Sequence, residues 1–535
     1  MFLRILFNLR LLTKKGETMH EIVKMENILK VYPNGIVANK SVNFSIVEGE
    51  IHALVGENGA GKSTLMKILF GIEQFTDGKI MLNGQEVKFN NPQEAIKHGI
   101  GMVHQHFMLV PSLTVAENVV LGDEPKKAGG ILDINRAIKE TKDLADKYHF
   151  DIDPKMKVED CSVGTKQKIE ILKALFHGAK VLILDEPTAV LTPQETTELF
   201  KELMLLKEKG HTIIFISHKL NEVKEISNRI TIMRAGKDVG TYHTDKVSKE
   251  DISNLMVGRE VIWDLEKTKA DPKNVTVRVE NITLVNEHKR RLLDDVSFSL
   301  RQGEILGVVG VEGNGQRELV DVLTGLQKIS AGKINIMHQN IDKYTIRQIR
   351  DLGVSHIPED RMTLGVAEFA SIEDNLLSIY FDKKDFLNGP FMKQKEINVW
   401  AKDKVKDYTV KTASEKTQVK MLSGGNIQKV VVAREFSNNP KVIVADQPTR
   451  GIDVGAAQFI HKKLIELRDN GASVLLVSAD LTEVMDLSDS LIVFYSGKIV
   501  AYFEDASKLT ETELGLYMLG LKSQTEQEVR RCVYA

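Results

Sequence analysis

An internal repeat is the feature that most constrains the fold of this chain. The segment LVGENGAGKSTL aligns with the later segment VVGVEGNGQREL, and further segments align in the same order. The offset is 254 residues from Gly56 to Gly310 and 261 residues from Asp185 to Asp446, so the second copy carries 7 additional residues. Because 535 residues are also too many for one ordinary domain, we predict two similar domains fused head to tail.

The repeat and one charged segment set the predicted domain boundaries. We predict a first domain over residues 19–262, a linker over 263–273, a second domain over 274–523 and a tail over 524–535. Residues 1–18 contain a short apolar run that Arg4 and Arg10 interrupt, without the small-residue cleavage site of a secretory signal. They are either a short helix on a membrane surface or a segment upstream of the true start at Met19, and we exclude them from the fold.

The composition argues against several classes of function. The formal net charge of −2 lacks the basic surplus of a protein that binds nucleic acid, and 42% apolar with 27% charged residues is typical of a globular protein. Two cysteines, Cys161 and Cys532, are too few for a disulfide framework or a metal cluster and fit a reducing compartment. The sequence contains no run of about 18–20 apolar residues, so we expect any membrane role to depend on a partner.

Each copy shows the pattern of an α/β fold. GEIHALVG and GEILGVVG are apolar runs that end in glycine, as expected of a buried strand that enters a loop. KSTLMKILFG and QRELVDVLTG follow with helical spacing of apolar residues and also end in glycine. VLILDE and TIIFISH are predicted to be buried parallel strands that end in polar residues. Ligands of such sheets bind at the carboxyl ends of the strands, so these polar ends should face one site.

The first copy contains a complete phosphate-loop motif. GENGAGKST matches G-x-x-x-x-G-K-[ST] between a predicted strand and a predicted helix, the context that distinguishes this motif from a chance glycine-rich turn. Backbone N–H groups of such a loop and the positive end of the helix bind phosphate oxygens. We predict that Lys62 reaches the β- and γ-phosphates and that the Ser63 hydroxyl ligates Mg²⁺. The loop residues assigned to phosphate binding are Gly56, Glu57, Asn58, Gly59, Ala60, Gly61, Lys62, Ser63 and Thr64.

Polar residues near the other strand ends complete the predicted chemistry. Asp185 is assigned to Mg²⁺, and Glu186 to a general base or to orienting the attacking water. The alternative is that these two adjacent acids are merely solvated. His218 closes another predicted strand, where an isolated histidine is more often structural than catalytic. Gln105 lies in VHQHF between two histidines, for which packing of the loop is the simpler interpretation.

The order of these motifs, namely the phosphate loop, VHQ, LSGGN, DEPT and SH, resembles that of the ATP-binding subunits of ABC transporters over nearly all of residues 20–520. The resemblance implies two tandem P-loop ABC-type nucleotide-binding domains, each with a RecA-like α/β core, a helical signature subdomain and an antiparallel β part. It implies that Glu186 is the catalytic base, that His218 senses the γ-phosphate and that Gln105 links Mg²⁺, water and the membrane partner. Tyr32 matches the aromatic residue that stacks on adenine. The residues assigned to Mg²⁺ are then Ser63, Gln105 and Asp185.

The resemblance also implies two composite sites, because the domains of that family pair head to tail and each ATP lies between the phosphate loop of one and the signature of the other. The first site adds residues of the second copy to the first phosphate loop: Ser423, Gly424, Gly425, Asn426 and Asp453. The degenerate second site comprises Gly310, Gly315, Gln316, Arg317, Glu318, Glu359, Asp446, Gln447, Ala479, Ser162 and Gly164. Gln316 replaces the lysine and Gln447 the base, and an amide cannot accept a proton as a carboxylate does. We therefore expect hydrolysis at the first site only, while nucleotide binding at the second stays open.

A fused pair with this asymmetry resembles the ATP-binding protein of bacterial importers for monosaccharides and nucleosides. Segments such as SVGTKQKIEILKAL and LMVGRE resemble the nucleoside branch, and the ribose/galactose branch is the alternative. The resemblance implies ATP and Mg²⁺ as cofactors, with two transmembrane permease subunits and an extracytoplasmic solute-binding (lipo)protein as partners. It also implies a peripheral position on the cytoplasmic face of the cell membrane and no nucleic-acid partner.

Two other classes of function compete with the importer. A soluble twin ABC ATPase that acts on ribosomes or DNA would be expected to have two competent sites and a long charged linker. The single complete site, the short linker and the slightly acidic charge argue against it. A purely regulatory ATP binder is the third class, and the presence of Glu186 and His218 argues against that one.

Overall fold

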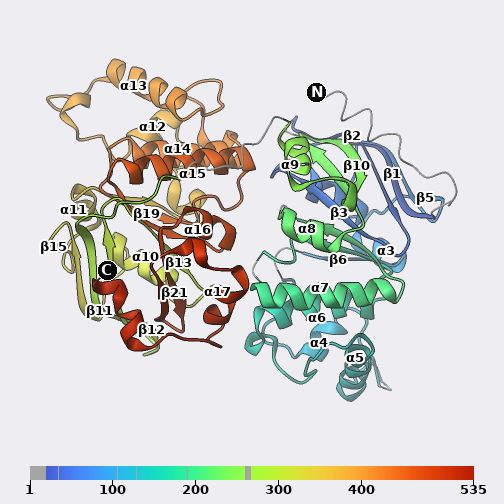
Figure 1. The fold of residues 1–535 in the computed structure, drawn as a ribbon. Helices are drawn as coiled ribbons and strands as arrows, with labels where there is room; N and C mark the ends of the chain where they lie inside the picture. Colours follow the sequence, from blue (N-terminus) through green and yellow to red (C-terminus); the bar gives the residue numbers. More distant parts are fainter. Residues whose placement is uncertain are drawn as a thin grey trace. The chain divides into compact units, whose positions relative to one another are not determined.

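The structure is a computed structural model, and two compact units divide the chain. It describes residues 20–33, 35–104, 107–127, 129–189, 191–217, 219–258 and 267–534. The first unit comprises residues 1–261 and the second residues 262–535 (Figure 1). The predicted extension over residues 1–18 lies outside the described residues, as do Met19 and residues 263–266 of the predicted linker.

Two sheets build the first unit. One is antiparallel with the order β2-β1-β4-β5, and the other has the order β10-β9-β3-β8-β7-β6, in which only the edge pair β9–β10 is antiparallel. The strands are β1 Glu21–Val31, β2 Val37–Val47, β3 Ile51–Gly56, β4 Asp77–Leu82, β5 Gln85–Val87, β6 Ile100–Val103, β7 Val181–Asp185, β8 Thr212–Ile216, β9 Arg229–Arg234 and β10 Lys237–His243. Strands β3, β7 and β8 are buried along their whole length, which confirms the prediction from their continuous apolar runs.

The helices of the first unit follow these strands. They are α2 Lys62–Leu69, α3 Pro92–Lys97, α4 Val115–Val119, α5 Ile134–Tyr148, α6 Val163–Phe176, α7 Pro193–Glu208, α8 Leu220–Ile226 and α9 Lys249–Val257, with 3₁₀ turns at Val158–Asp160 and Thr244–Lys246. Helices α4, α5 and α6 pack together beside α7 (Figure 1). Capping boxes, in which Thr114 pairs with Glu117 and Thr192 with Glu195, satisfy the free N–H groups that start α4 and α7.

The second unit repeats the topology of the first. Its antiparallel sheet has the order β12-β11-β14-β15, and its larger sheet has the order β16-β19-β20-β13-β21-β22, which is the order of the first unit read from the other edge. The strands are β11 Val275–Val285, β12 Arg291–Arg301, β13 Ile305–Val309, β14 Ala331–Ile336, β15 Gln339–Asn340, β16 Val354–Ile357, β17 Leu387–Asn388, β18 Phe391–Met392, β19 Val442–Asp446, β20 Ser473–Val477, β21 Ser490–Tyr495 and β22 Lys498–Phe503. The predicted α/β class with two similar domains is confirmed.

The helices of the second unit match those of the first and add two, α18 and α19, at the C-terminal end. They are α10 Gln316–Thr324, α11 Ile346–Asp351, α12 Ile372–Leu377, α13 Gln394–Asp407, α14 Gly424–Phe436, α15 Val454–Asp469, α16 Leu481–Leu487, α17 Glu511–Met518, α18 Glu526–Val529 and α19 Arg531–Tyr534. Short turns lie at Arg361–Gly365, Lys384–Phe386, Val419–Met421 and Ala506–Lys508. No helix in the described part of the chain combines the length and the apolar character needed to cross a membrane.

Part of the additional residues of the second copy lies in a segment that forms a turn against the loop that follows β19. The turn Arg361–Gly365 lies in the segment where the repeat loses register. Arg361 donates hydrogen bonds from Nη1 to the carbonyl oxygen of Arg450 over 2.6 Å and from Nη2 to that of Gly451 over 3.1 Å. Arg361 therefore supports the loop between β19 and α15.

Both ends of the second copy are bound to its core. Thr268 belongs to the predicted linker, and its carbonyl oxygen accepts a hydrogen bond of 2.9 Å from the buried side chain of Arg468. In the predicted tail, the Gln524 side chain bonds both backbone groups of Tyr502 on β22, at 2.8 and 3.0 Å. Cys532 is buried next to β12, and Ser299 of that strand donates to the carbonyl oxygen of Val533 over 2.8 Å. The described tail residues are thus part of the folded second unit.

Candidate functional site

The phosphate loop of the first unit lies between β3 and α2 in a conformation that its neighbours hold. Gly61 has a φ of 96°, in the left-handed region that glycine adopts without strain. A Cβ at this position would lie 2.5 Å from the carbonyl oxygen of Ala38. Buried Asn39 donates from Nδ2 to the carbonyl oxygen of Gly61 over 3.1 Å. No side chain caps α2, so its first N–H groups are available to an anion.

Lys62 folds back onto the loop from which it is predicted to reach a phosphate. Its Nζ donates to the carbonyl oxygens of Gly56 over 2.7 Å and Glu57 over 3.1 Å, and the residue is 5% exposed. Burial lowers the pKa of Lys62, and the nearby carboxylates of Glu186, Asp185 and Glu57 oppose this shift. A bound phosphate would offer the ammonium group a stronger acceptor than these carbonyl oxygens.

The residues predicted to bind Mg²⁺ are adjacent. The Ser63 hydroxyl lies 3.5 Å from Oδ1 of Asp185, which is buried at the end of β7. Burial raises the pKa of Asp185, and the charge of Glu186 raises it further, while Ser63 and Lys62 oppose the shift. A carboxylate and a hydroxyl are the hard oxygen donors that Mg²⁺ prefers, so this pair fits the ion. The third assigned residue, Gln105, lies outside the described residues.

The backbone at the predicted base is strained in both units. Glu186 has a φ of 49° and donates its N–H to the carbonyl oxygen of Ile216 over 3.0 Å. Gln447, at the matching position, has a φ of 48° and donates to the carbonyl oxygen of Val477 over 2.8 Å. A left-handed φ is uncommon for glutamate or glutamine and costs free energy. Because both units adopt it, the fold maintains this turn whether the residue carries a carboxylate or an amide. His218, the predicted sensor, lies outside the described residues.

Tyr32 lies beside the first loop but makes polar contacts through its hydroxyl. The hydroxyl donates to Oε2 of Glu73 over 2.8 Å and lies 3.5 Å from the Thr64 hydroxyl. The Nζ atom of Lys30 is 5.0 Å from the centre of the ring. These contacts place the aromatic ring at the edge of the phosphate loop, and its assignment to adenine stays a prediction.

The second phosphate loop keeps the shape of the first and changes its contacts. Gly315 has a φ of 112° and begins α10 as Gly61 begins α2. Gln316 donates from Nε2 to the carbonyl oxygen of Val311 over 3.2 Å, the contact that Lys62 makes with Glu57. Leu293 takes the place of Asn39 at this turn. An amide thus fills the place of the ammonium group without its charge.

Charged side chains surround Asp446 at the end of β19. Burial raises the pKa of Asp446 to about 7, and the charges of Glu359 and Asp321 contribute, while Arg317 and Arg450 lower it. Arg450 also forms an ion pair with Glu359. Arg317, in the place of Ser63, therefore brings a permanent positive charge to the side of the loop where the first unit has its predicted Mg²⁺ residues.

Replacing Asp446 by Asn should raise the stability of the second unit at pH 8. The folded pKa of about 7 exceeds the value of about 3.9 in an unfolded chain. Between these values the folded state binds more protons, so the free energy of unfolding falls as pH rises to 7. At about 1.4 kcal/mol per pKa unit, the loss is on the order of a few kcal/mol. Urea unfolding of both proteins at pH 5 and 8 should show a difference that grows with pH.

The control for this prediction is Asp403→Asn, which removes an exposed acid of the same unit. Its effect on the free energy of unfolding should not change between pH 5 and 8. Parallel pH profiles for the wild-type chain and Asp446→Asn would contradict the assignment of this titration to Asp446.

The two signature segments start their helices differently. Ser423 precedes α14, where no side-chain bond caps the helix, and its hydroxyl accepts from Nδ2 of Asn426 over 2.8 Å. Asn426 also accepts the backbone N–H of Lys411 over 2.8 Å. Ser162 instead caps α6, because its hydroxyl accepts the N–H of Thr165 over 3.1 Å. The second-copy signature thus leaves more of its N–H groups to a ligand.

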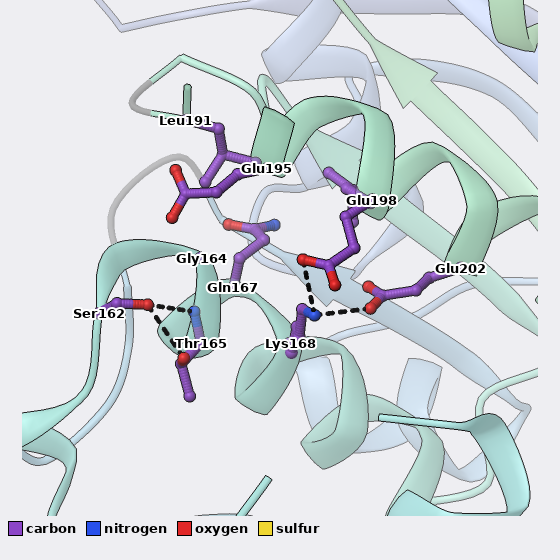
Figure 2. A pocket seen from close by; sticks show the side chains of 10 residues that line it. Ser162, Gly164, Thr165, Gln167, Lys168, Leu191, Glu195, Glu198 and Glu202 are labelled. Carbon is purple, nitrogen blue, oxygen red and sulfur yellow. Dashed lines mark hydrogen bonds and ion pairs between the residues drawn. The ribbon is translucent and has the colours of Figure 1, made fainter. Parts of the chain in front are cut away.

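A small pocket of about 70 Å³ lies beside the first signature, between α6 and α7. Figure 2 shows the Lys168 ammonium between two carboxylates, and its Nζ lies 3.3 Å from Glu198 and 2.8 Å from Glu202. The Glu195 carboxylate lies next to Gly164 in the same view. The T-x-x-E pattern at Thr192 indicates that Glu195 caps a helix, but no motif indicates its place beside Gly164.

Sequence reasoning also missed two matched acids behind the strand ends. Glu222 accepts hydrogen bonds from Thr188 over 2.6 Å and from Ser217 over 3.3 Å. In the second unit, Glu483 accepts from the matching threonine and serine, Thr449 over 2.7 Å and Ser478 over 2.6 Å. Comparing the copies at the offset of 261 residues would have found this pair. Asn39 has no counterpart of its chemistry in the second copy, so the repeat offered no signal for it.

The sequence of the chain is similar to known proteins over nearly its whole length. The family model described as ABC transporter matches residues 39–189 and 293–450. The guanosine import ATP-binding protein NupO of Bacillus subtilis is 45% identical and covers 94% of this chain and 98% of its own. The glucose import ATP-binding protein TsgD13 of Haloferax volcanii is 41% identical over 94% and 96%. The nucleoside import ATP-binding protein NupA of Lactococcus lactis is 40% identical over 93% and 98%.

One solved structure aligns with both units. It is a chain in the complex of archaeal ribosomal stalk protein and archaeal ribosome recycling factor, with a TM-score of 0.58 and 20% identity, covering 89% of this chain and 90% of that one. At this identity the likeness concerns the fold alone.

Proposed function

Because this chain belongs to the ABC transporter family, we propose that it is the ATP-hydrolysing subunit of an importer and that the imported solute is a nucleoside. The family assignment carries ATP binding with it. The relatives named for guanosine and nucleoside import, at 45% and 40% identity, support the choice of solute. A relative named for glucose import stands between them at 41%, so the experiment below includes monosaccharides.

We propose that hydrolysis occurs at the first phosphate loop. Lys62 would exchange its carbonyl contacts for the β- and γ-phosphates, and Glu186 would accept the proton of the attacking water. Ser63, Asp185 and Gln105 would hold Mg²⁺, which when bound offsets charge on the phosphate oxygens. His218 would contact the γ-phosphate and Tyr32 the adenine. The proximity of Lys62, Ser63, Asp185 and Glu186 supports this assignment.

The remaining assigned residues belong to the same proposal. We propose that the second-copy signature and Asp453 contribute to the ATP held by the first loop, and that the second loop does not hydrolyse nucleotide. The available N–H groups at the start of α14 support the first statement. The amides at Gln316 and Gln447 and the missing histidine at Ala479 support the second.

The proposed partners follow from the importer role. We propose two transmembrane permease subunits and an extracytoplasmic solute-binding protein as partners, and a position on the cytoplasmic face of the membrane. The relatives' names as import ATP-binding proteins support this view. The ATPase does not itself define the solute, since the fold is shared by many systems.

An uptake assay tests the proposed function. Cells that lack the gene would receive either the wild-type chain or Glu186→Gln, and uptake of labelled guanosine, ribose and glucose would be measured. We expect guanosine uptake with the wild-type chain only. Uptake of a monosaccharide instead would replace the nucleoside assignment. The importer role would be overturned if uptake of none of the three solutes depended on the wild-type chain and the chain co-purified with ribosomes.

Gln316→Lys alone should not create a second active site. Gln447 and Ala479 remain in place, so the restored lysine would face phosphate without a base or a histidine. The substitution is best made in Glu186→Gln, where turnover at the first loop is already lost and any new activity belongs to the second. We expect ATP hydrolysis to stay at the level of Glu186→Gln. A clear increase in ATP hydrolysis would show that the second loop needs only the lysine to hydrolyse ATP.

A further inference from the structure

Each signature helix begins against a carboxylate of its own unit, and the two carboxylates come from different positions. A Cβ on Gly164 of α6 would lie 2.7 Å from Oε1 of Glu195. A Cβ on Gly425 of α14 would lie 2.7 Å from Oδ2 of Asp453. Both glycines are the second residue of their helix, so the two contacts are equivalent in space.

The second oxygen of each carboxylate caps the helix that carries the acid. Oε2 of Glu195 accepts the N–H and the hydroxyl of Thr192, over 3.0 and 3.1 Å, at the start of α7. Oδ1 of Asp453 accepts the N–H of Ala456 over 2.8 Å at the start of α15. One acid thus lies between the starts of two helices in each unit, with one oxygen toward each.

The repeat reveals how the acid changed position. At the offset of 261 residues, Thr192 matches Asp453 and Glu195 matches Ala456. The first unit has a hydroxyl at the cap position and the acid three residues later, and the second unit has the acid at the cap and alanine three residues later. These are two known solutions for starting a helix, and both deliver a carboxylate to the signature glycine.

Helix electrostatics explains why an acid is kept at this place. The N-terminus of an α-helix carries a partial positive charge, which a nearby carboxylate stabilises. A side chain at either glycine would displace the carboxylate, so glycine lets the acid approach the start of the helix this closely. Figure 2 shows this arrangement in the first unit, where Glu195 faces the turn that contains Gly164.

We propose that Glu195 and Asp453 are equivalent positioning residues, each of which fixes its signature helix through the same carboxylate–glycine contact. For Asp453 the inference rests on the proposed function, because it assigns its effect on ATP hydrolysis to the placement of α14. The acid at 453 is then replaceable by one at 456, as in the first unit. Glu195 holds α6 in the same way, in a place that the signature motifs do not mark.

The test in the second unit moves the acid by three residues. We expect Asp453→Thr to lower kcat for ATP hydrolysis by about 10- to 100-fold through a displaced signature helix. Adding Ala456→Glu to this variant should recover kcat to within about threefold of the wild-type value, since a correctly placed helix restores the geometry. A double variant that is folded by thermal unfolding but as inactive as Asp453→Thr would overturn the inference.

The test in the first unit does not depend on activity. Amide hydrogen exchange of residues 163–167 should become faster in Glu195→Ala and return toward the wild-type rate in Thr192→Asp/Glu195→Ala, which copies the second unit. Glu208→Ala, at the far end of α7, serves as the control and should leave this exchange unaltered. Unchanged exchange in Glu195→Ala would refute the positioning role even if the ATPase assignment holds. Wild-type kcat in Asp453→Thr with altered exchange at residues 424–428 would instead refute the proposed composite site.

Discussion

Glu186→Gln is expected to abolish ATP turnover while the protein still binds MgATP. The substitution keeps the size of the side chain and removes its ability to accept a proton, and a positioned general base contributes roughly 10²- to 10⁴-fold to a rate. The left-handed turn that presents residue 186 should persist, because the second unit maintains the same turn with Gln447. Steady-state phosphate release and binding of a fluorescent ATP analogue measure the two properties separately.

The control for Glu186→Gln is Glu208→Gln, which replaces an acid at the end of α7. This control protein should hydrolyse ATP at the wild-type rate. Turnover within a few-fold of wild type in Glu186→Gln would remove this residue as the base. Loss of nucleotide binding along with turnover would show instead that Glu186 contributes to the binding of ATP itself.

Ser423→Arg and Ser162→Arg should have very different effects on ATP hydrolysis. The Ser423 hydroxyl lies at the uncapped start of α14, and an arginine there would obstruct the N–H groups that we propose to contribute to ATP binding. Loss of such donors costs about 10²- to 10³-fold in rate. Ser162 caps α6 in the degenerate half, so Ser162→Arg should cost mainly the helix cap, about 1 kcal/mol.

The pair of variants contains its own control, since both replace the same residue type at matched positions. Phosphate release should fall by at least tenfold more in Ser423→Arg than in Ser162→Arg. Thermal unfolding checks that both chains fold. Equal losses in the two variants would contradict the assignment of hydrolysis to the site that includes the second-copy signature.

Motif spacing predicted the parts of the site that lie within one short segment. The strand, loop and helix around Lys62 follow from apolar runs and glycines, and the structure places them as expected. The proximity of Ser63 and Asp185 also followed, because the carboxyl ends of the parallel strands of one sheet lie at the same edge, and β3 and β7 belong to one sheet. Gln105 and His218 lie outside the described residues, so their roles stay predictions.

Contacts between segments that are distant in sequence escaped prediction. Asn39 lies on β2 of the antiparallel sheet and donates a hydrogen bond to the carbonyl oxygen of Gly61. An isolated asparagine in a strand shows no sequence pattern that identifies such a role. Arg361 lies in the segment that contains part of the insertion of the second copy, and it supports the loop after β19 through two backbone carbonyl oxygens. Backbone acceptors leave no trace in the residue types, so only the folded chain reveals the contact.

The sequence by itself determined the repeat, the α/β class and the division of the two copies into a complete and an altered set of catalytic side chains. These properties depend on periodicity and on residue type, which are local and can be counted along the chain. Only the tertiary structure showed that Glu195 and Asp453 reach equivalent places at the two signature glycines. The reason is that a helix start can be capped from either of two positions three residues apart, and the convergence of both solutions on one point in space is a property of the packed helices.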